Sequence, residues 1–347
     1  MRVFISAAEP SGDRIAAGLV ESLKKRRPHW HFGGIVGPKL RDFGVEAVAD
    51  ISALSVMGLW EVLPKALSIW RLQRRIRREL SDWDAVITVD SSSFNRPLLR
   101  AMKRICRPAI GVVSPQVWAT RPHRAQQLPH EQDQLLCLFN FEPPLYPKDF
   151  AVHVGHPVID ELVPRTNHQT HLFGLLPGSR AQEIKRHLPI FLEAAAIVRQ
   201  QIPAARFLIS TPQPLTGLPQ HVHWVTGGAR QMNAVQAALT KSGTITLELA
   251  RMGVPMIVAH KVSLLTWWIG KRLLICPWVA LPNILSKARV VPEYLQHLDA
   301  QILANELISV QEQHVDLSPC GEGGAFEQMA NHCERIILRH SHTGQML

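Results

Sequence analysis

The feature that most constrains the fold of this chain is a regular alternation of short apolar runs with longer amphipathic stretches. In the first half, the runs Arg2–Ala7, Phe32–Val36, Ala85–Val89 and Ile110–Ser114 have the composition of buried strands, and residues 15–25 have the spacing of a helix. Alternating strands and helices build a parallel sheet with helices on both faces. The sequence therefore predicts an α/β domain with a doubly wound sheet.

The same pattern begins again after a polar stretch at residues 164–171. Leu172–Leu176 is an expected strand, a helix should follow it as far as Gln200, and further strands are expected at Arg206–Ser210 and Met256–Ala259. Two Rossmann-like, doubly wound domains facing a cleft are therefore expected, with ligands beyond the carboxyl ends of the strands. The expected limits are 1–165 for the first domain, 166–325 for the second and 326–347 for a C-terminal helix that can pack back on the first.

The chain is basic, with 38 lysine and arginine residues against 28 aspartate and glutamate residues and a formal net charge of +10. Such an excess indicates an anionic partner, which could be nucleic acid, a phosphorylated substrate or a membrane surface. The sequence has no zinc-finger, helix-turn-helix or RNP signature, so nucleic acid is not expected.

Cysteine usage and apolar run lengths indicate the compartment. The five cysteines are scattered without a CxxC pair, so neither a metal centre nor a disulfide framework is expected, and a reducing compartment is. No signal peptide is visible, and no apolar run reaches about 18 residues, so a transmembrane helix is not expected.

Two loops of the second half have the composition of anion sites. Leu175–Arg180 lies between a strand and a helix: Gly178 allows close backbone approach, Ser179 and the first helical N–H groups can hold a phosphate, and Arg180 adds a planar fork. The second loop contains Ser242, Gly243 and Thr244, and Glu248 lies one helical turn later, where its carboxylate can accept hydrogen bonds from two ribose hydroxyls. Each loop alone is also typical of a helix cap, but together they favour a nucleotide diphosphate.

Two motifs of the first half follow predicted strands. Asp90 ends the strand Ala85–Val89, where a carboxylate can act as general base for a hydroxyl nucleophile, although an Asx turn or a helix N-cap is the commoner role. In Glu9–Asp13, Ser11 and Gly12 form a tight turn and Asp13 falls in the first turn of the helix. This second motif can bind an acceptor or cap the helix.

The segment Leu59–Leu80 combines an apolar stripe, Trp70 and a strongly basic face. Its basic residues are Lys65, Arg71, Arg74, Arg75, Arg77 and Arg78. The pattern is typical of a helix at a membrane interface, and a core helix with a solvated basic face gives the same pattern. Leu264–Leu274 also combines tryptophans with basic residues, Lys271 and Arg272.

The motifs occur in the order and spacing of a known family, and the chain resembles bacterial lipid-A-disaccharide synthases over about residues 1–300. The matching motifs are Ala8–Asp13, Gly37-Pro38, Leu54–Gly58, Glu61–Leu63, Asp90 with Phe94-Asn95, Val113–Ala119, Phe141-Glu142, Val154–Pro157, Leu175–Arg180, Ser242–Thr244 with Glu248, Leu281–Asn283 and Val291–Gln296. The chain departs from the family's Asp-x-Pro-Asp-Phe-Asn at Ser92 and Ser93.

The resemblance implies an inverting glycosyltransferase of the GT-B fold that works without a metal or other cofactor at the cytoplasmic face of the inner membrane. The implied donor is UDP-2,3-diacylglucosamine, the acceptor is 2,3-diacylglucosamine 1-phosphate, and the products are the β-1,6-linked lipid A disaccharide 1-phosphate and UDP. Another UDP-sugar GT-B enzyme and a non-catalytic membrane-surface paralogue stay open as alternatives. The oligomeric state is also open, with a homodimer among the options.

The resemblance also implies a role for individual residues. Asp90 would be the base, and Arg180 would neutralise the leaving diphosphate. The implied acceptor-side residues are Glu9, Ser11, Gly12, Asp13 and Asn95. The implied UDP-sugar residues are Gly178, Ser179, Arg180, Ser242, Gly243, Thr244, Glu248, Asn283, Glu293 and Gln296. The implied membrane-facing residues are Trp70, Arg71, Arg74, Arg75 and Arg78.

Overall fold

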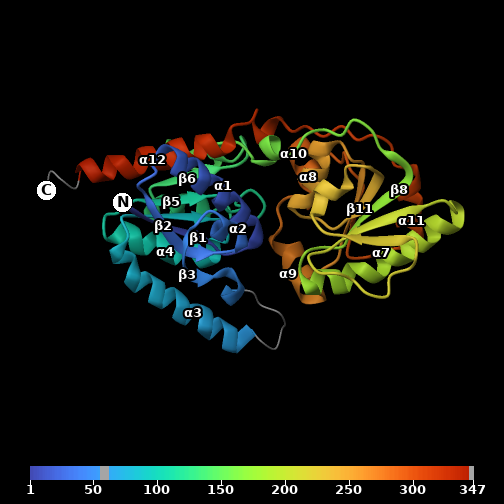
Figure 1. The fold of residues 1–347 in the computed structure, drawn as a ribbon, viewed down its shortest axis with the longest axis horizontal. Helices are drawn as coiled ribbons and strands as arrows, with labels where there is room; N and C mark the ends of the chain where they lie inside the picture. Colours follow the sequence, from blue (N-terminus) through green and yellow to red (C-terminus); the bar gives the residue numbers. More distant parts are fainter. Residues whose placement is uncertain (55–61, 344–347) are drawn as a thin grey trace. The chain divides into compact units, whose positions relative to one another are not determined.

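A computed structural model describes residues 1–54 and 62–343 and divides the chain into two compact units (Figure 1). Unit 1 consists of Met1–Pro157 and Pro319–Leu347, and unit 2 consists of Val158–Ser318. Two of the predictions fall partly outside the described residues. They are the family motifs, at positions 55–58 and 61, and the predicted basic helix, at positions 59–61.

Both domain boundaries differ from the predicted ones by seven or eight residues, for reasons of hydrogen bonding. Residues 158–165 are tied to unit 2, because Arg251 donates to the carbonyls of Ile159 and Leu162. At the other boundary, the carbonyl of Cys320 accepts from the amide of His156 at 2.8 Å, which ties the segment after Ser318 to unit 1. Short polar connections carry no apolar pattern, so the sequence did not indicate which unit holds them.

In the described part of unit 1, seven parallel strands form a sheet in the order β3-β2-β1-β4-β5-β6-β7. The strands are β1 Arg2–Ala7, β2 His31–Val36, β3 Glu46–Asp50, β4 Ala85–Val89, β5 Ala109–Val112, β6 Gln134–Cys137 and β7 Ala151–His153. The strand order reverses between β1 and β4, and such a switch point is where doubly wound sheets bind ligands.

The larger helices of unit 1 cover this sheet. They are α1 Pro10–Arg26, α2 Pro38–Asp42, α3 Val62–Glu79, α4 Ser92–Arg104 and α12 Ala325–Thr343. The C-terminal helix α12 packs against α1, where Gly18 leaves room for the ring of Phe326: a Cβ atom at position 18 would lie 2.4 Å from it. Glu334 of α12 accepts from Arg26 and Arg27 at 2.7 and 2.6 Å, so α12 is held to the C-terminal end of α1.

In the described part of unit 2, six parallel strands follow the order β10-β9-β8-β11-β12-β13. The strands are β8 Gln169–Leu176, β9 Arg206–Ser210, β10 Val222–Val225, β11 Val235–Thr240, β12 Met256–His260 and β13 Glu293–Leu295. The helices are α6 Val158–Glu161, α7 Ala181–Gln201, α8 Thr244–Met252, α9 Leu264–Leu273, α10 Leu281–Ser286 and α11 Ala300–Ser309. The core between the sheet, α7 and α11 is built around Phe173, Phe191 and Leu303.

The predicted fold class, two α/β units with doubly wound parallel sheets, is confirmed. Strand β11 was not predicted, because its sequence Val-Gln-Ala-Ala-Leu-Thr is short and alanine-rich, and periodicity alone cannot assign such a run. Within the described residues, no helix combines the length and the apolar character needed to cross a bilayer.

Candidate functional site

Asp90 immediately follows the central strand β4 and has a left-handed backbone. Its φ is 56° and that of Ser91 is 44°, a conformation that is unfavourable by about 1–2 kcal/mol for a residue with a side chain. The pair is held by hydrogen bonds: the Asp90 amide donates to the Val112 carbonyl at 3.0 Å, and the Ser91 amide donates to Asp90 Oδ1 at 2.7 Å. Backbone strain that the surroundings maintain is typical of functional sites.

Asn95 holds this turn through hydrogen bonds of its side-chain amide. It is 1% exposed, accepts from Ser6 Oγ at 2.6 Å through Oδ1, and donates through Nδ2 to the Asp90 carbonyl at 2.7 Å. Because both ends of its amide are used inside the protein, Asn95 is a positioning residue for Asp90. The resemblance implied an acceptor-side role for Asn95, whereas the structure shows its side chain bonded to Ser6 and to the backbone of Asp90.

The loop after β1 meets the same turn. Ser91 Oγ donates to Glu9 Oε1 at 2.9 Å. Gly12 allows the first turn of α1 to approach β4, since a Cβ atom there would lie 3.1 Å from the carbonyl oxygen of Val89. Ser11 lies between Glu9 and Gly12 in chain order and is half-buried. Glu9, Gly12 and Asp90 thus gather at the switch point of the first sheet.

Asp13 has a different place from the one predicted. It is 1% exposed, and its carboxylate caps the N-terminus of α2: Oδ1 accepts from the amide of Gly37 at 2.8 Å and Oδ2 from that of Lys39 at 2.8 Å. A carboxylate at a helix N-terminus satisfies amides that have no partner in the helix. The helix that Asp13 caps is 24 residues further along the chain, a contact that local sequence does not indicate.

In unit 2, a pocket lies at the carboxyl ends of β8, β9 and β11. Its lining includes the predicted residues Gly178, Ser179, Ser242, Gly243, Thr244 and Glu248. The two predicted anion loops therefore come together. The lining also contains Thr211, Gly227 and Gly228, which the sequence analysis missed; the Gly-Gly pair after a strand was the available signal.

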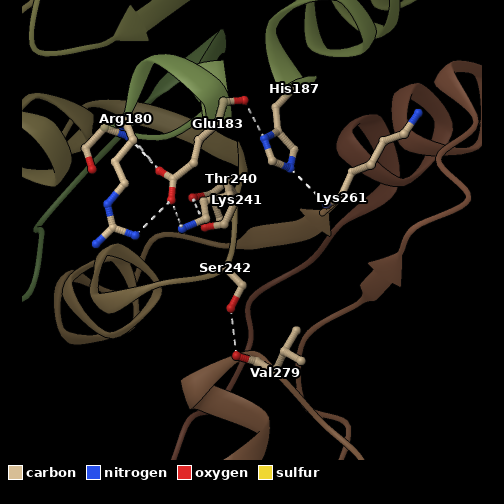
Figure 2. Close-up of polar contacts among 9 residues, drawn as sticks. Arg180, Glu183, His187, Thr240, Lys241, Ser242, Lys261 and Val279 are labelled. Atoms are coloured by element: carbon tan, nitrogen blue, oxygen red, sulfur yellow. Dashed lines mark hydrogen bonds and ion pairs between the residues drawn. The ribbon is translucent and has the colours of Figure 1, made fainter. Parts of the chain in front are cut away.

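Glu183 and Lys241 join the two loops (Figure 2). Lys241 Nζ donates to Glu183 Oε1 at 2.9 Å, and Glu183 Oε2 accepts from the amides of Ser179 and Arg180 at 3.1 and 3.3 Å. Burial alone would raise the pKa of Glu183, but the hydrogen bond and charge of Lys241 lower it overall. A carboxylate thus occupies the helix N-terminus that was predicted to hold a phosphate.

A second cationic group, the guanidinium of Arg180, lies near the Glu183 carboxylate at the predicted anion site. The guanidinium of Arg180 lies 3.7 Å from Glu183 Oε1, and its side chain is 66% exposed. Gly178 has φ 125°, and a Cβ atom there would lie 2.6 Å from that of Glu183, so glycine is required at this turn. Neither Glu183 nor Lys241 was predicted, although Glu183 stands at the third helical position, where glutamate is typical of a capping box.

Four of the predicted UDP-sugar-binding residues have side chains that form hydrogen bonds within the protein. Asn283 is fully buried, accepts from the amides of Val290 and Val291 at 2.9 Å each, and donates to Glu293. Glu293 also accepts from the amides of Val279 and Ala280 at 2.9 Å each, and Ser242 Oγ donates to the Val279 carbonyl at 2.6 Å (Figure 2). Gln296 exchanges hydrogen bonds with the backbone of Val262. Asn283, Glu293 and Gln296 are not among the residues that line the pocket.

A buried polar cluster lies beyond the ends of β5, β6 and β7. Glu142 is 3% exposed and accepts from the amide of Phe139 at 3.1 Å. Burial raises the pKa of Glu142 to about 7 and lowers that of His156 to about 3. The rings of Phe139 and His156 stack 5.5 Å apart. Two of the family motifs supply Glu142 and His156, and the sequence indicated no role for either residue.

Helix α3 has one side packed on the core and one exposed, basic side, an arrangement that fits both alternatives left open by the sequence. Its inner side packs on the core, where Ile76 is fully buried. On the outer side Trp70 is 50% exposed, and the guanidinium of Arg74 lies 5.4 Å from the centre of its ring. The remaining predicted membrane-facing residues, Arg71, Arg75 and Arg78, are also exposed.

Comparison with known proteins identifies sequence relatives over almost the whole chain. A family model described as lipid-A-disaccharide synthetase matches residues 3–316. The chain is 35% identical over 366 residues to the lipid-A-disaccharide synthase of Geobacter metallireducens, with 95% of each chain covered. It is 37% identical over 324 residues to that of Burkholderia vietnamiensis, covering 86% of this chain and 83% of the relative.

Solved structures with low sequence identity share the fold. The UDP-GlcNAc 2-epimerase of Methanocaldococcus jannaschii is 12% identical, with a TM-score of 0.59 over 96% of this chain and 100% of that one. The calicheamicin glycosyltransferase CalG4 is 14% identical, with a TM-score of 0.55 over 98% of this chain and 94% of that one. Both the expected GT-B fold and the expected resemblance are thereby confirmed.

Proposed function

The chain belongs to the lipid-A-disaccharide synthase family, and we propose that Asp90 and the pocket of unit 2 carry out the reaction of that family. The protein is a glycosyltransferase. It transfers 2,3-diacylglucosamine from UDP-2,3-diacylglucosamine to 2,3-diacylglucosamine 1-phosphate, and it forms the β-1,6-linked disaccharide 1-phosphate and UDP.

The observation that carries the mechanism is the strained turn at the switch point of the first sheet. Asp90 accepts the proton of the acceptor's 6-hydroxyl as the oxygen attacks the anomeric carbon of the donor, and the bond from that carbon to the diphosphate oxygen breaks. General bases contribute about 10²–10⁴-fold to such steps. Asn95 fixes the turn, and Glu9 accepts a hydrogen bond from Ser91 of that turn. In this proposal Glu9 and the nearby Ser11 contact the acceptor.

The pocket of unit 2 receives the UDP group in this proposal. Lys241, Arg180 and the N-terminus of α7 hold the diphosphate and stabilise the negative charge that develops as UDP leaves. Glu248, which lines the same pocket, accepts hydrogen bonds from the ribose. Because Glu183 contacts Lys241 and the two amides just before α7 in the structure, the incoming diphosphate takes over contacts that this carboxylate makes.

We further propose that the exposed face of α3 attaches unit 1 to the cytoplasmic side of the inner membrane. Trp70 supplies an amphipathic anchor, and the arginines of the same face supply charge complementary to anionic headgroups. The proposed reaction uses no metal, so turnover should be unchanged in EDTA.

The test is release of UDP from the purified protein with the two diacylated substrates, compared with the same sugars lacking acyl chains. We expect UDP release only with the acylated pair. Turnover of the unacylated pair at an equal rate would favour a GT-B enzyme with a soluble substrate. UDP binding without release from either pair would favour the non-catalytic alternative.

A further inference from the structure

Unit 2 carries an exposed apolar surface that the proposed function does not use. It lies on α9 and the two residues after this helix. The exposed fractions are 79% for Leu264, 60% for Trp268 and 63% for Ile275, and Leu273 and Leu274 are also exposed. Contiguous exposed apolar side chains of this size mark interaction sites rather than ordinary surface.

The stretch of chain that carries this surface is positively charged. In the sequence, no aspartate or glutamate occurs between Lys261 and Pro292. The stretch contains five exposed basic residues: Lys261, Lys271, Arg272, Lys287 and Arg289. The guanidinium of Arg272 lies 3.5 Å from the centre of the Trp268 ring, so the aromatic and the cationic groups form one continuous surface.

The start of this helix is held to the body of unit 2. The amide of Lys261 donates to His187 Nε2 at 2.9 Å (Figure 2), and the amide of Val262 donates to Gln296 Oε1 at 3.1 Å. Ser263 then caps the helix by accepting from the amide of Thr266 at 3.2 Å. The apolar side chains are therefore presented to solvent by an anchored helix.

We propose that this α9 surface, defined as Lys261, Leu264, Trp268, Lys271, Arg272 and Ile275, binds the surface of an anionic lipid bilayer. Tryptophan and aliphatic side chains enter the headgroup boundary, while the basic groups meet anionic headgroups. The charge selects this occupant over a second copy of the chain, because a symmetric contact would bring the same cations together. This surface belongs to unit 2, whereas the α3 face belongs to unit 1.

The test measures partition onto vesicles of phosphatidylcholine with about one third phosphatidylglycerol. To remove the α3 contribution, all proteins carry Trp70→Ser together with Arg71→Gln, Arg74→Gln, Arg75→Gln and Arg78→Gln. In this background, the triple change Leu264→Ser, Trp268→Ser and Ile275→Ser should weaken partition about 10-fold or more. Val163→Ser, which alters another apolar residue of unit 2 that is 74% exposed, is the matched control and should have no effect.

The charge pair Lys271→Gln and Arg272→Gln gives a second measurement that does not touch the apolar groups. It should weaken partition onto the anionic vesicles and leave the weak partition onto pure phosphatidylcholine unchanged. Unaltered partition of both variants would overturn the proposal. The proposal would also be overturned if the triple variant partitioned like its parent but no longer formed a dimer seen for the parent by light scattering. That result would assign the surface to a contact with a second copy of the chain. A protein without transferase activity would still give these results, so this test and that of the proposed function fail separately.

Discussion

The carboxyl edges of the two sheets offer opposite chemistry from the same topology. At the first edge, hydrogen bonds converge on the acid Asp90, and its left-handed backbone is maintained by Asn95 and Val112. At the second edge, helix N-termini and Lys241 converge on a space for an anion, and the carboxylate of Glu183 contacts them. The doubly wound topology thus determines that polar groups meet at the carboxyl ends of the strands. The residues that follow each strand determine whether that place carries an acid or binds an anion.

The support of the two edges also differs. The left-handed backbone of Asp90 is strained and is maintained by hydrogen bonds from its neighbours. The anion site is instead formed by backbone amides and an ion pair. We therefore expect substitutions at the first edge to lower turnover without affecting UDP binding. Substitutions at the second edge should lower both, because the same groups hold UDP and stabilise the charge that develops as it leaves.

The largest expected effect is that of Asp90→Asn on turnover. Loss of the base should lower disaccharide formation about 1000-fold, which corresponds to about 4 kcal/mol in the barrier. UDP affinity by calorimetry should stay unchanged, because the UDP pocket belongs to unit 2. Asp82→Asn, an exposed acid of the same unit, is the control. A turnover within tenfold of wild type would remove Asp90 from the mechanism.

The second largest expected effect is that the buried Glu142 makes the free energy of unfolding depend on pH. Its pKa of about 7 lies above the ordinary 4.5, so the folded protein binds more protons in this range and loses stability as the pH rises through it. Glu142→Gln mimics the protonated form, and its stability relative to wild type should rise by about 3 kcal/mol between pH 4.5 and 8.

Urea unfolding at several pH values measures this difference. The lowered pKa of His156 makes both proteins gain stability as the pH rises from about 3 towards 6.5, and its effect cancels between them. Parallel curves for wild type and Glu142→Gln would contradict the assignment of a protonated glutamate.

The third prediction concerns Lys241. Lys241→Met should weaken UDP binding about 10- to 150-fold, because a hydrogen bond to a charged group contributes about 1.5–3 kcal/mol. The same change leaves Glu183 without its cation, so the double variant with Glu183→Gln separates the two roles. We expect the double variant to recover stability against urea and not UDP affinity; recovery of both would show that Lys241 serves only its internal partner.

The smallest expected effect is that of Asp13→Ala. Loss of the cap on α2 should lower the free energy of unfolding by about 1–2 kcal/mol, and the KM for the acceptor should be unchanged where the variant is folded. An increased KM with unchanged stability would instead place Asp13 on the acceptor side.

Much of the fold and part of the site could be predicted from the sequence. Buried parallel strands are nearly continuous apolar runs, and loops that follow them must meet at one edge, so Gly178 and Thr244 could be placed together before the structure was known. The missed features depend on distant partners. Asp13 caps a helix that begins at Pro38, and Glu183 pairs with a lysine 58 residues away. For the same reason, the bracing role of Asn283 could not be distinguished from a ligand contact.

The packing of α12 on α1 has a consequence for synthesis. Unit 2 is inserted between the two parts of unit 1, so a ribosome makes all of unit 2 before the helix that completes unit 1 emerges. At about 5–20 residues per second, the surface of α1 around Gly18 waits on the order of fifteen to sixty seconds for Phe326 and the rest of α12. The nascent first unit is incomplete during this interval, and a chain that stops at Ser318 never leaves that state.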